Sequence, residues 1–296
     1  MLNIHIFDAY EINEAKKQNL LNMKRILFTA LLIVSAITAF TFTSCKKEEP
    51  DTETQSAVDN SVCEGEFTSR MPVINSIAIK EQGVKSMMSG SPTIIIDEND
   101  TLNGFPITLI LDYGTVGTVD AIDSKTRKGQ IQATFDRSWD SLGAIVTVKF
   151  LNYYVKNAGA ANFVQYTCDS MMIVHNAAYS YTNTIIGGKC IAASWNLEWA
   201  CTRLLTQTAG MGDTIASNDV FQSSGTAVGK NREGKNYTVN VVVPVVKKFS
   251  CPWVDSGRID ITPEGLSVRT VDFGTGVCDN QASLTINGNT FVFNMN

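Results

Sequence analysis

The sequence predicts an all-β protein whose body is antiparallel and sandwich-like, built of hairpins and meanders. From Ser91 onward, short runs rich in Val, Ile, Thr, Tyr and Phe alternate with turns rich in Gly, Asn and Asp. That alternation is typical of strands joined by tight turns. Six cysteines are spread between residues 63 and 278, and an even number of cysteines is typical of exported domains closed by disulfides.

Residues 23–44 have the pattern of a signal peptide. Lys24 and Arg25 form a short basic region, residues 26–42 carry no charge and are mostly apolar, and small polar residues precede Cys45. We therefore predict a lipoprotein signal peptide with lipidation at Cys45. The alternative is a retained transmembrane helix, because an apolar run of about 18 residues can span a bilayer.

The segments on either side of the signal peptide follow from this interpretation. Residues 1–22 contain acidic side chains that would hinder membrane insertion, so we predict an extension read from a start codon upstream of Met23. A small N-terminal helix is the alternative for residues 1–22. Residues 45–70 are polar, which predicts a lipidated cysteine followed by a flexible tether. The charged residues directly after the cysteine are candidates for a surface-export signal: Lys46, Lys47, Glu48 and Glu49.

Residues 71–296 are predicted to form the globular β-rich region, as one domain or as two packed halves, 71–180 and 181–296. Its C-terminal third has the clearest pattern, because strand-like runs flank the turns NREG, PEG and Asn287-Gly288. Asn-Gly between such runs is the strongest short hairpin signal. The sequence therefore predicts three consecutive hairpins at this end of the chain.

The cysteines are predicted to pair within this framework. The C-terminal hairpins bring Cys251 and Cys278 to the same end, and a bond there would contribute about 3–4 kcal/mol to stability. The segment KCIAASWNLEWACTR reads as a hairpin whose centre lies between Trp195 and Asn196. Directly opposed residues in such a hairpin have Cβ atoms about 4.5–5.5 Å apart, so a disulfide there requires the closer, non-hydrogen-bonded type of pair. Three pairings follow, the last by elimination: Cys251–Cys278, Cys190–Cys201 and Cys63–Cys168.

Composition excludes several kinds of function. His175 is the one histidine after Cys45, so a zinc site with several histidine ligands is excluded there, and any Ser-His-Asp or Cys-His site would need His175. Its apolar context, MMIVHNAAY, favours a core or strand position instead. With 24 basic and 29 acidic residues, the chain lacks the basic surface that nucleic-acid binding requires. We predict no catalytic residue, no metal site, no cofactor and no nucleic-acid partner.

Acidic and aromatic residues each allow a functional and a structural interpretation. Two Asp-aromatic-Gly-Thr sequences and their neighbours are candidate calcium ligands, but Asp and Asn more often shape turns through their own backbone. The residues concerned are Asp112, Asp120, Asp123, Asp272, Asp279 and Asn280. Aromatic residues are candidates for a sugar-stacking platform, although core and cross-strand packing is favoured. They are Trp139, Trp195, Trp199, Trp253, Tyr153 and Tyr154.

Several stretches resemble uncharacterised lipoproteins of Bacteroidota. The C-terminal segments GTAVGKNREGKNYTVNVVVPVVKKFSCPW, SGRIDITPEG and TVDFGTGVCDNQASLTINGNTFVFNM are similar to the C-terminal half of that family. SPTIII, FPITLILDYGT, RKGQIQATF and GAIVTVKFLNYYV are similar to its N-terminal part, and CKKEE is similar to the charged motif that directs such lipoproteins to the cell surface. The resemblance implies an outer-membrane location, on the surface or the periplasmic face, and implies no catalytic residues.

Together these observations predict a lipid-anchored envelope protein that acts as a non-catalytic binding or structural module. Its expected partners are the membrane, through the lipid, and an unidentified glycan or protein ligand. The alternative is a glycan hydrolase or glycan-binding protein, because glycan hydrolysis needs only two carboxylates about 5–10 Å apart. A cleft lined by Trp195, Trp199 or Trp253 would favour that alternative.

Overall fold

A computed structural model describes residues 14, 16–26, 51–68, 73–74, 92–96, 104–120, 123–213 and 215–295. The chain divides into two compact units, Met1–Pro50 and Asp51–Asn296, which are described separately. In the first unit residues 16–26 are helical and exposed, and this helical stretch includes Met23, the predicted start of the protein. No helix in these ranges has both the length and the apolar character needed to span a membrane. Residues 27–50, including Cys45 and the charged residues after it, lie outside the described part.

The second unit is mostly β structure, which confirms the predicted all-β fold. Its described residues contain fifteen strands in one antiparallel sheet. The strands are β1 Thr93–Ile96, β2 Ile107–Asp112, β3 Thr118–Val119, β4 Thr126–Phe135, β5 Ile145–Lys156, β6 Val164–Thr167, β7 Ser170–Ala177, β8 Ser180–Ile191, β9 Asn196–Ala209, β10 Val220–Lys230, β11 Asn236–Lys248, β12 Ser256–Pro263, β13 Arg269–Thr275, β14 Gln281–Ile286 and β15 Asn289–Asn294. Neighbours along the chain are mostly neighbours in the sheet, so the topology is a meander.

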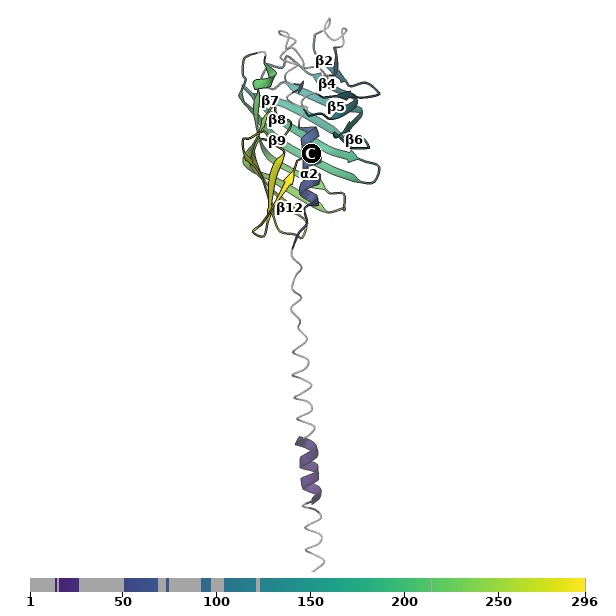
Figure 1. The fold of residues 1–296 in the computed structure, drawn as a ribbon, viewed down its shortest axis with the longest axis vertical. Coiled ribbons are helices and arrows are strands. Elements are labelled where there is room, and N and C mark those ends of the chain that lie inside the picture. Colours follow the sequence, from purple (N-terminus) through teal and green to yellow (C-terminus); the bar gives the residue numbers. More distant parts are fainter. Residues whose placement is uncertain are drawn as a thin grey trace, which may run out of the picture. The chain divides into compact units, whose positions relative to one another are not determined.

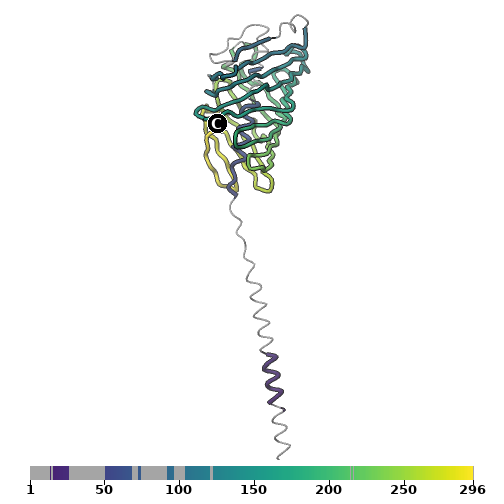
Figure 2. Tube along the Cα trace, turned by 90° about the vertical axis from the view of Figure 1, so that its right-hand side faces the viewer, coloured from purple at the N-terminus to yellow at the C-terminus, as the bar shows by residue number. Residues whose placement is uncertain are grey.

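The sheet curves around one helix, α2 Gln55–Phe67 (Figure 1). This helix contacts β8, β9 and β12, and the trace in Figure 2 shows the sheet bending through the unit. Inward-facing side chains of strands β2 to β14 form one hydrophobic cluster that also includes Ala57, Cys63 and Phe67. The core therefore lies on the concave face of a single sheet and surrounds α2.

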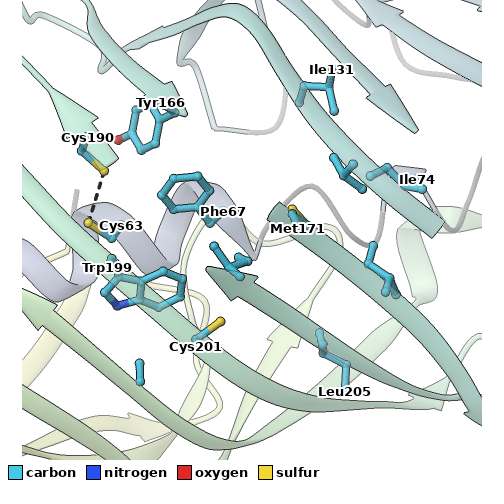
Figure 3. Packing of buried hydrophobic residues seen from close by; sticks show 14 of the residues in the cluster. Cys63, Phe67, Ile74, Ile131, Tyr166, Met171, Cys190, Trp199, Cys201 and Leu205 are labelled. Carbon is cyan, nitrogen blue, oxygen red and sulfur yellow. Dashed lines mark hydrogen bonds between the residues drawn. The ribbon is translucent and has the colours of Figure 1, made fainter. Parts of the chain in front are cut away.

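Helix α2 corrects the prediction of a flexible tether over residues 45–70. Residues 51–68 are ordered, and Phe67 is fully buried. The Phe67 ring lies edge-on to Phe150, with centroids 5.4 Å apart. It also lies edge-on to Tyr166 and stacks on Trp199, with centroids 5.5 and 5.9 Å away (Figure 3). The polar composition suggested disorder. The composition gave the wrong prediction because one face of the helix packs against the core and the acidic side chains of the helix pair with arginines of the β-rich unit.

The start of α2 is held by a side chain that lies just before the helix. Thr54, at the N-cap, makes no capping hydrogen bond, and the Ser56 amide instead donates to the Glu53 carboxylate at 2.7 Å. The helix ends where the Thr68 hydroxyl donates to the Glu64 carbonyl oxygen at 2.5 Å. Both contacts satisfy backbone groups that a helix terminus leaves without partners.

A row of paired glycine and aromatic residues creates the space in which α2 packs. Gly188, Trp199, Gly229 and Tyr237 face one another across β8, β9, β10 and β11. A Cβ atom on Gly229 would collide with the Tyr237 ring, and one on Gly188 would approach the Phe67 ring at 3.3 Å. The two glycines therefore leave room for the large rings beside them.

The C-terminal hairpins agree with the sequence prediction. Strand β10 ends at Lys230 and β11 begins at Asn236, so the turn NREG joins them. Strands β14 and β15 are joined by Asn287 and Gly288, whose φ angles are 49° and 81°. Positive φ at both central residues is the requirement of the type I′ turn, and Asn-Gly meets it at little cost.

Candidate functional site

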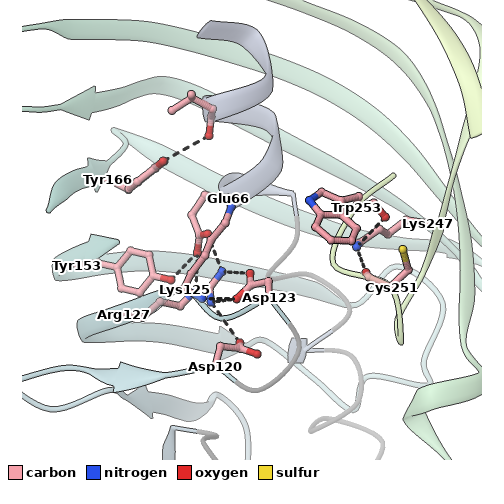
Figure 4. Close-up of polar contacts among 11 residues, drawn as sticks. Glu66, Asp120, Asp123, Lys125, Arg127, Tyr153, Tyr166, Lys247, Cys251 and Trp253 are labelled. Carbon is pink, nitrogen blue, oxygen red and sulfur yellow. Dashed lines mark hydrogen bonds and ion pairs between the residues drawn. The ribbon is translucent and has the colours of Figure 1, made fainter. Parts of the chain in front are cut away.

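Arginines on the sheet and carboxylates in the α2 segment form the polar framework of the interior. Arg127 of β4 is fully buried, and its Nε and Nη2 donate to the two carboxylate oxygens of Glu66 at 3.0 and 2.8 Å. Asp123 accepts from the same guanidinium at 2.7 and 2.9 Å, and the Tyr153 hydroxyl donates to Glu66 at 2.5 Å (Figure 4). Burial opposes the charge of Arg127, but the Glu66 carboxylate outweighs it and raises the pKa of Arg127.

Three further arginines pair with carboxylates of α2 or of the residues just before it. Arg203 of β9 lies 2.8 Å from the Glu64 carboxylate, and Arg232 lies 2.5 Å from the fully buried Asp59. Arg269 of β13 pairs with Asp51 and, at 3.3 Å, with Glu53. Three arginines in strands, and Arg232 in the turn between β10 and β11, therefore hold the segment from Asp51 to Glu66, and α2 is a fixed part of the inner wall.

A cavity of about 180 Å³ lies between α2 and the concave face of the C-terminal strands. Its wall from the sheet and the following loops is largely apolar: Leu205, Phe221, Val245, Phe249, Pro252, Trp253, Val254, Ile259, Val271, Phe273, Phe293 and Met295. Residues from α2 and from the loop before β4 add a polar edge: Asn60, Ser61, Glu64, Asp120, Asp123 and Lys125. The cavity therefore suits a small molecule with an apolar body.

A lysine positions the one tryptophan that lines the cavity. Lys247 of β11 donates to the carbonyl oxygens of Cys251 and Trp253, the second at 3.0 Å (Figure 4). Next to this loop, Cys251 and Cys278 form a disulfide, which confirms that predicted pairing. The lysine and the disulfide together fix the loop that carries Trp253.

The carboxylates that line the cavity are engaged by arginines. Glu64 pairs with Arg203, while Asp120 and Asp123 pair with Arg127 at 3.2 and 2.7 Å. A hydrolytic pair would need one carboxylic acid to donate a proton and one free carboxylate. Each of these three groups instead has a structural charge partner, so they hold α2 and the β4 loop in place.

Most of the aromatic candidates for a sugar platform belong to the interior. Trp139, Trp199 and Tyr153 are buried. Trp195 is half-buried with the Arg232 guanidinium 4.5 Å above its ring. Tyr154 lies beneath the ammonium group of Lys128 at 4.8 Å. These residues form no common exposed surface, and Trp253 alone among the six lines the cavity.

His175 is a core residue of β7, as its apolar context predicts. Its Nδ1 lies 2.9 Å from the carbonyl oxygen of Trp139, and its ring stacks on Tyr181 with centroids 5.1 Å apart. The Trp139 and Tyr181 rings are themselves stacked at 5.1 Å. His175 therefore completes an aromatic cluster.

The acidic turn residues behave mainly as turn-forming residues. Asp112 accepts the Gly114 amide at 2.7 Å, and Asp272 accepts the Gly274 amide at 2.9 Å, so both Asp-aromatic-Gly sequences make the same turn. Asp279 accepts the Gln281 amide at 3.0 Å. Asp120 and Asp123 differ from these turn residues because their carboxylates pair with Arg127. The backbone carbonyl of Asn280 accepts a hydrogen bond from the Met295 amide at 2.7 Å. The contacts favour the structural interpretation over calcium ligation.

Two of the predicted disulfides are wrong. In the β8–β9 hairpin Cys190 faces Leu197 and Cys201 faces Ile185, because the turn closes between Ala192 and Trp195. The four remaining described cysteines are Cys63, Cys168, Cys190 and Cys201, and none is bonded in the structure. Cys63 lies beside Cys190, with the two sulfur atoms 3.2 Å apart, so Cys168 has lost its predicted partner.

One group of potential metal ligands occurs in the described ranges. The side chains of Cys251, Asp255 and Cys278 offer ligand atoms within 4.8 Å of one another. Both sulfur atoms already belong to the disulfide, and Asp255 accepts the Lys248 amide at 2.8 Å. The group is therefore explained by the fold of this loop.

Sequence reasoning missed α2 and the cavity behind it. The signal was weak, because the segment CEGE, which carries Cys63, Glu64 and Glu66, matches no chemical motif. The chain matches no known protein family, no curated protein and no solved structure.

Proposed function

We propose that this chain is an exported, lipid-anchored binding protein that holds a small, largely apolar molecule between α2 and the concave sheet. The observation that carries the proposal is the cavity of about 180 Å³ with its apolar wall and one polar edge. Binding sites for small molecules are typically concave and apolar, with a few polar groups that set orientation.

The size of the cavity limits the ligand. An apolar protein cavity of about 150 Å³ accepts benzene, so this one suits a molecule of one or two rings or a short branched chain. Phe221, Phe273 and Phe293 supply aromatic surface for such a group. The Ser61 hydroxyl donates to the Val58 carbonyl oxygen at 2.7 Å, and its oxygen can still accept a hydrogen bond from a single polar substituent on the ligand.

The anchor is proposed from the signal peptide and the resemblance to Bacteroidota lipoproteins. With lipid on Cys45 and the ordered unit beginning at Asp51, the linker is short. Six residues reach at most about 20 Å when fully extended. The body would therefore stay close to the outer membrane, where apolar small molecules concentrate.

A glycan hydrolase receives less support from the same contacts. Its chemistry requires a free pair of carboxylates beside a sugar-binding surface. The three carboxylates at the cavity pair with arginines, and Trp199 is buried beneath α2 rather than exposed to a polysaccharide.

The binding proposal is tested by titrating the purified protein with 1-aminonaphthalene, a neutral fluorescent probe whose emission shifts when it leaves water. Gly65 of α2 lines the cavity and is exposed, and a Cβ atom there meets nothing within 4 Å, so Gly65→Phe adds a ring at the mouth of the cavity without a backbone clash. Leu142→Phe is the matched control, because Leu142 is 65% exposed outside the cavity. We expect saturable binding that Gly65→Phe weakens at least tenfold and Leu142→Phe leaves unchanged. Equal binding by all three proteins would refute the site.

A further inference from the structure

Two buried cysteines meet at the interface between α2 and the sheet. The Sγ atoms of Cys63 in α2 and Cys190 in β8 are 3.2 Å apart, and both residues are completely buried (Figure 3). A disulfide bond is about 2.05 Å long, so a shift of roughly 1 Å separates the observed pair from a bonded one. The residues are 127 positions apart in the sequence, and no hairpin geometry brings them together.

The other thiols do not share this arrangement. Cys168 is half-buried and Cys201 is buried, and neither contacts another thiol in the part of the chain that the structure describes. Phe67, Tyr166 and Trp199 surround the Cys63–Cys190 pair (Figure 3). Among these four cysteines, Cys63 and Cys190 are thus the two whose sulfur atoms lie next to each other.

We infer that Cys63 and Cys190 form a disulfide in the mature protein, cross-linking α2 to the sheet. The inference rests on the proposed export, because disulfides persist in oxidising compartments. Each thiol loses one proton and one electron as the S–S bond forms. A disulfide of an envelope oxidoreductase accepts the two electrons and becomes two thiols.

Burial determines when this bond forms. Desolvation, followed by the contact with Cys63, raises the pKa of the Cys190 thiol, so the reactive thiolate is scarce once α2 is docked. The bond therefore forms while the helix is still docking, and afterwards the core shields it from reductants. Cys278 is exposed, so the Cys251–Cys278 bond is the one that a reductant reaches first.

The bond has a consequence for the cavity. Ala57, Ser61 and Glu64 of α2 form part of the cavity wall, and Cys63 lies in the same two turns of the helix. A covalent link at Cys63 keeps that wall in place when force is applied through the nearby anchor. It complements the arginine contacts, of which the Arg269–Asp51 pair weakens as pH falls through the pKa of Asp51.

Peptide mapping of the full-length protein extracted from membranes tests the bond directly. Free thiols are alkylated under denaturing conditions, and the digest is then analysed without reduction. We expect one cross-linked peptide pair for Cys63 and Cys190, with Cys168 and Cys201 alkylated. Alkylated Cys63 and Cys190 in a sample with an intact Cys251–Cys278 bond would overturn the inference.

The Cys251–Cys278 bond also separates this inference from the proposed export. If all these cysteines are alkylated, export has failed, and the pair is then tested by refolding the reduced protein with oxidised glutathione. Formation of Cys63–Cys190 under those conditions supports the inference, and its absence overturns it.

Single and double variants provide a second readout. If the bond exists, Cys63→Ala, Cys190→Ala and the double variant lower the melting temperature by the same amount, because each removes one bond. Cys201→Ala is the control, and its effect adds to that of Cys63→Ala. Additive losses from Cys63→Ala and Cys190→Ala would contradict a shared covalent bond.

Discussion

Arg127 of β4 and Glu66 of α2 form a two-point ion pair in which both side chains are sealed from solvent. The pair joins residues 61 positions apart and fixes the end of α2 against the N-terminal half of the sheet. An ion pair of this kind contributes most through the cost of breaking it, because the remaining buried charge would lose its most deeply buried partner.

Replacing Glu66 by Gln should therefore destabilise the protein. Arg127 would keep Asp120 and Asp123, but the glutamine amide is uncharged and has one acceptor oxygen, so Arg127 loses a charge partner and one of its two contacts to α2. We expect the free energy of unfolding to fall by about 3 kcal/mol, measured by chemical denaturation. The control is Arg258→Gln, since the Arg258–Asp272 pair is exposed, and its loss should stay below about 1 kcal/mol. Equal losses would show that the buried pair has no special role.

Glycine substitutions test how α2 fits against the sheet. A methyl group on Gly229 would collide with the Tyr237 ring, so Gly229→Ala should lower the free energy of unfolding by about 1–3 kcal/mol. Gly65→Ala should raise it by about 0.5–1 kcal/mol, because the site is open and alanine favours a helix. Thermal and chemical denaturation of the two variants measure both changes. The same sign for both would contradict the described packing.

Asp51 should contribute a pH-dependent part of stability. Burial would raise the pKa of Asp51, but hydrogen bonds from the Glu53 and Ser267 amides and from Arg269 outweigh burial and lower it from 3.8. Because the folded pKa is the lower one, the stabilisation is present above pH 3.8 and is lost as pH falls through the folded value. The melting temperatures of wild type and Asp51→Asn should thus converge as pH falls below 3.8. A constant gap would argue against the Arg269 contact.

The lipid anchor is tested in cells by Cys45→Ala. Without the acylated cysteine the protein should move from the membrane fraction to the soluble fraction, since the anchor supplies the membrane affinity. Fractionation followed by immunoblotting measures the change, and Ser44→Ala is a matched control that should stay membrane-bound. Retention of Cys45→Ala in membranes would favour the transmembrane alternative.

Local sequence patterns predicted the strands and the C-terminal hairpins but not α2. Asn287 and Gly288 determine their turn by themselves, and for that reason the β14–β15 hairpin was predictable. The charged partners of residues 51–66 are 61 to 218 residues away, as in Arg127–Glu66 and Arg269–Asp51. No local pattern reports such pairs, so a polar segment with few apolar residues resembled a tether.

Cysteine pairing failed for a related reason. The residues between Cys190 and Cys201 contain no glycine or Asn-Gly pair that marks the turn, and the hairpin closes between Ala192 and Trp195. A small displacement of the turn changes which residues face each other. The Cys251–Cys278 pairing succeeded because the hairpins on either side have clear turns.

The most direct test of the binding account is methyl NMR of methionine-labelled protein during titration with 1-aminonaphthalene. Met295 lines the cavity, whereas Met172 is 38% exposed on β7 and lies outside it. Met295→Leu assigns the first signal. We predict a saturable shift of the Met295 methyl resonance, absent in Gly65→Phe, while Met172 stays unchanged. Probe binding that leaves the Met295 methyl resonance unchanged, or that shifts the Met172 methyl resonance instead, would contradict a ligand site beneath α2.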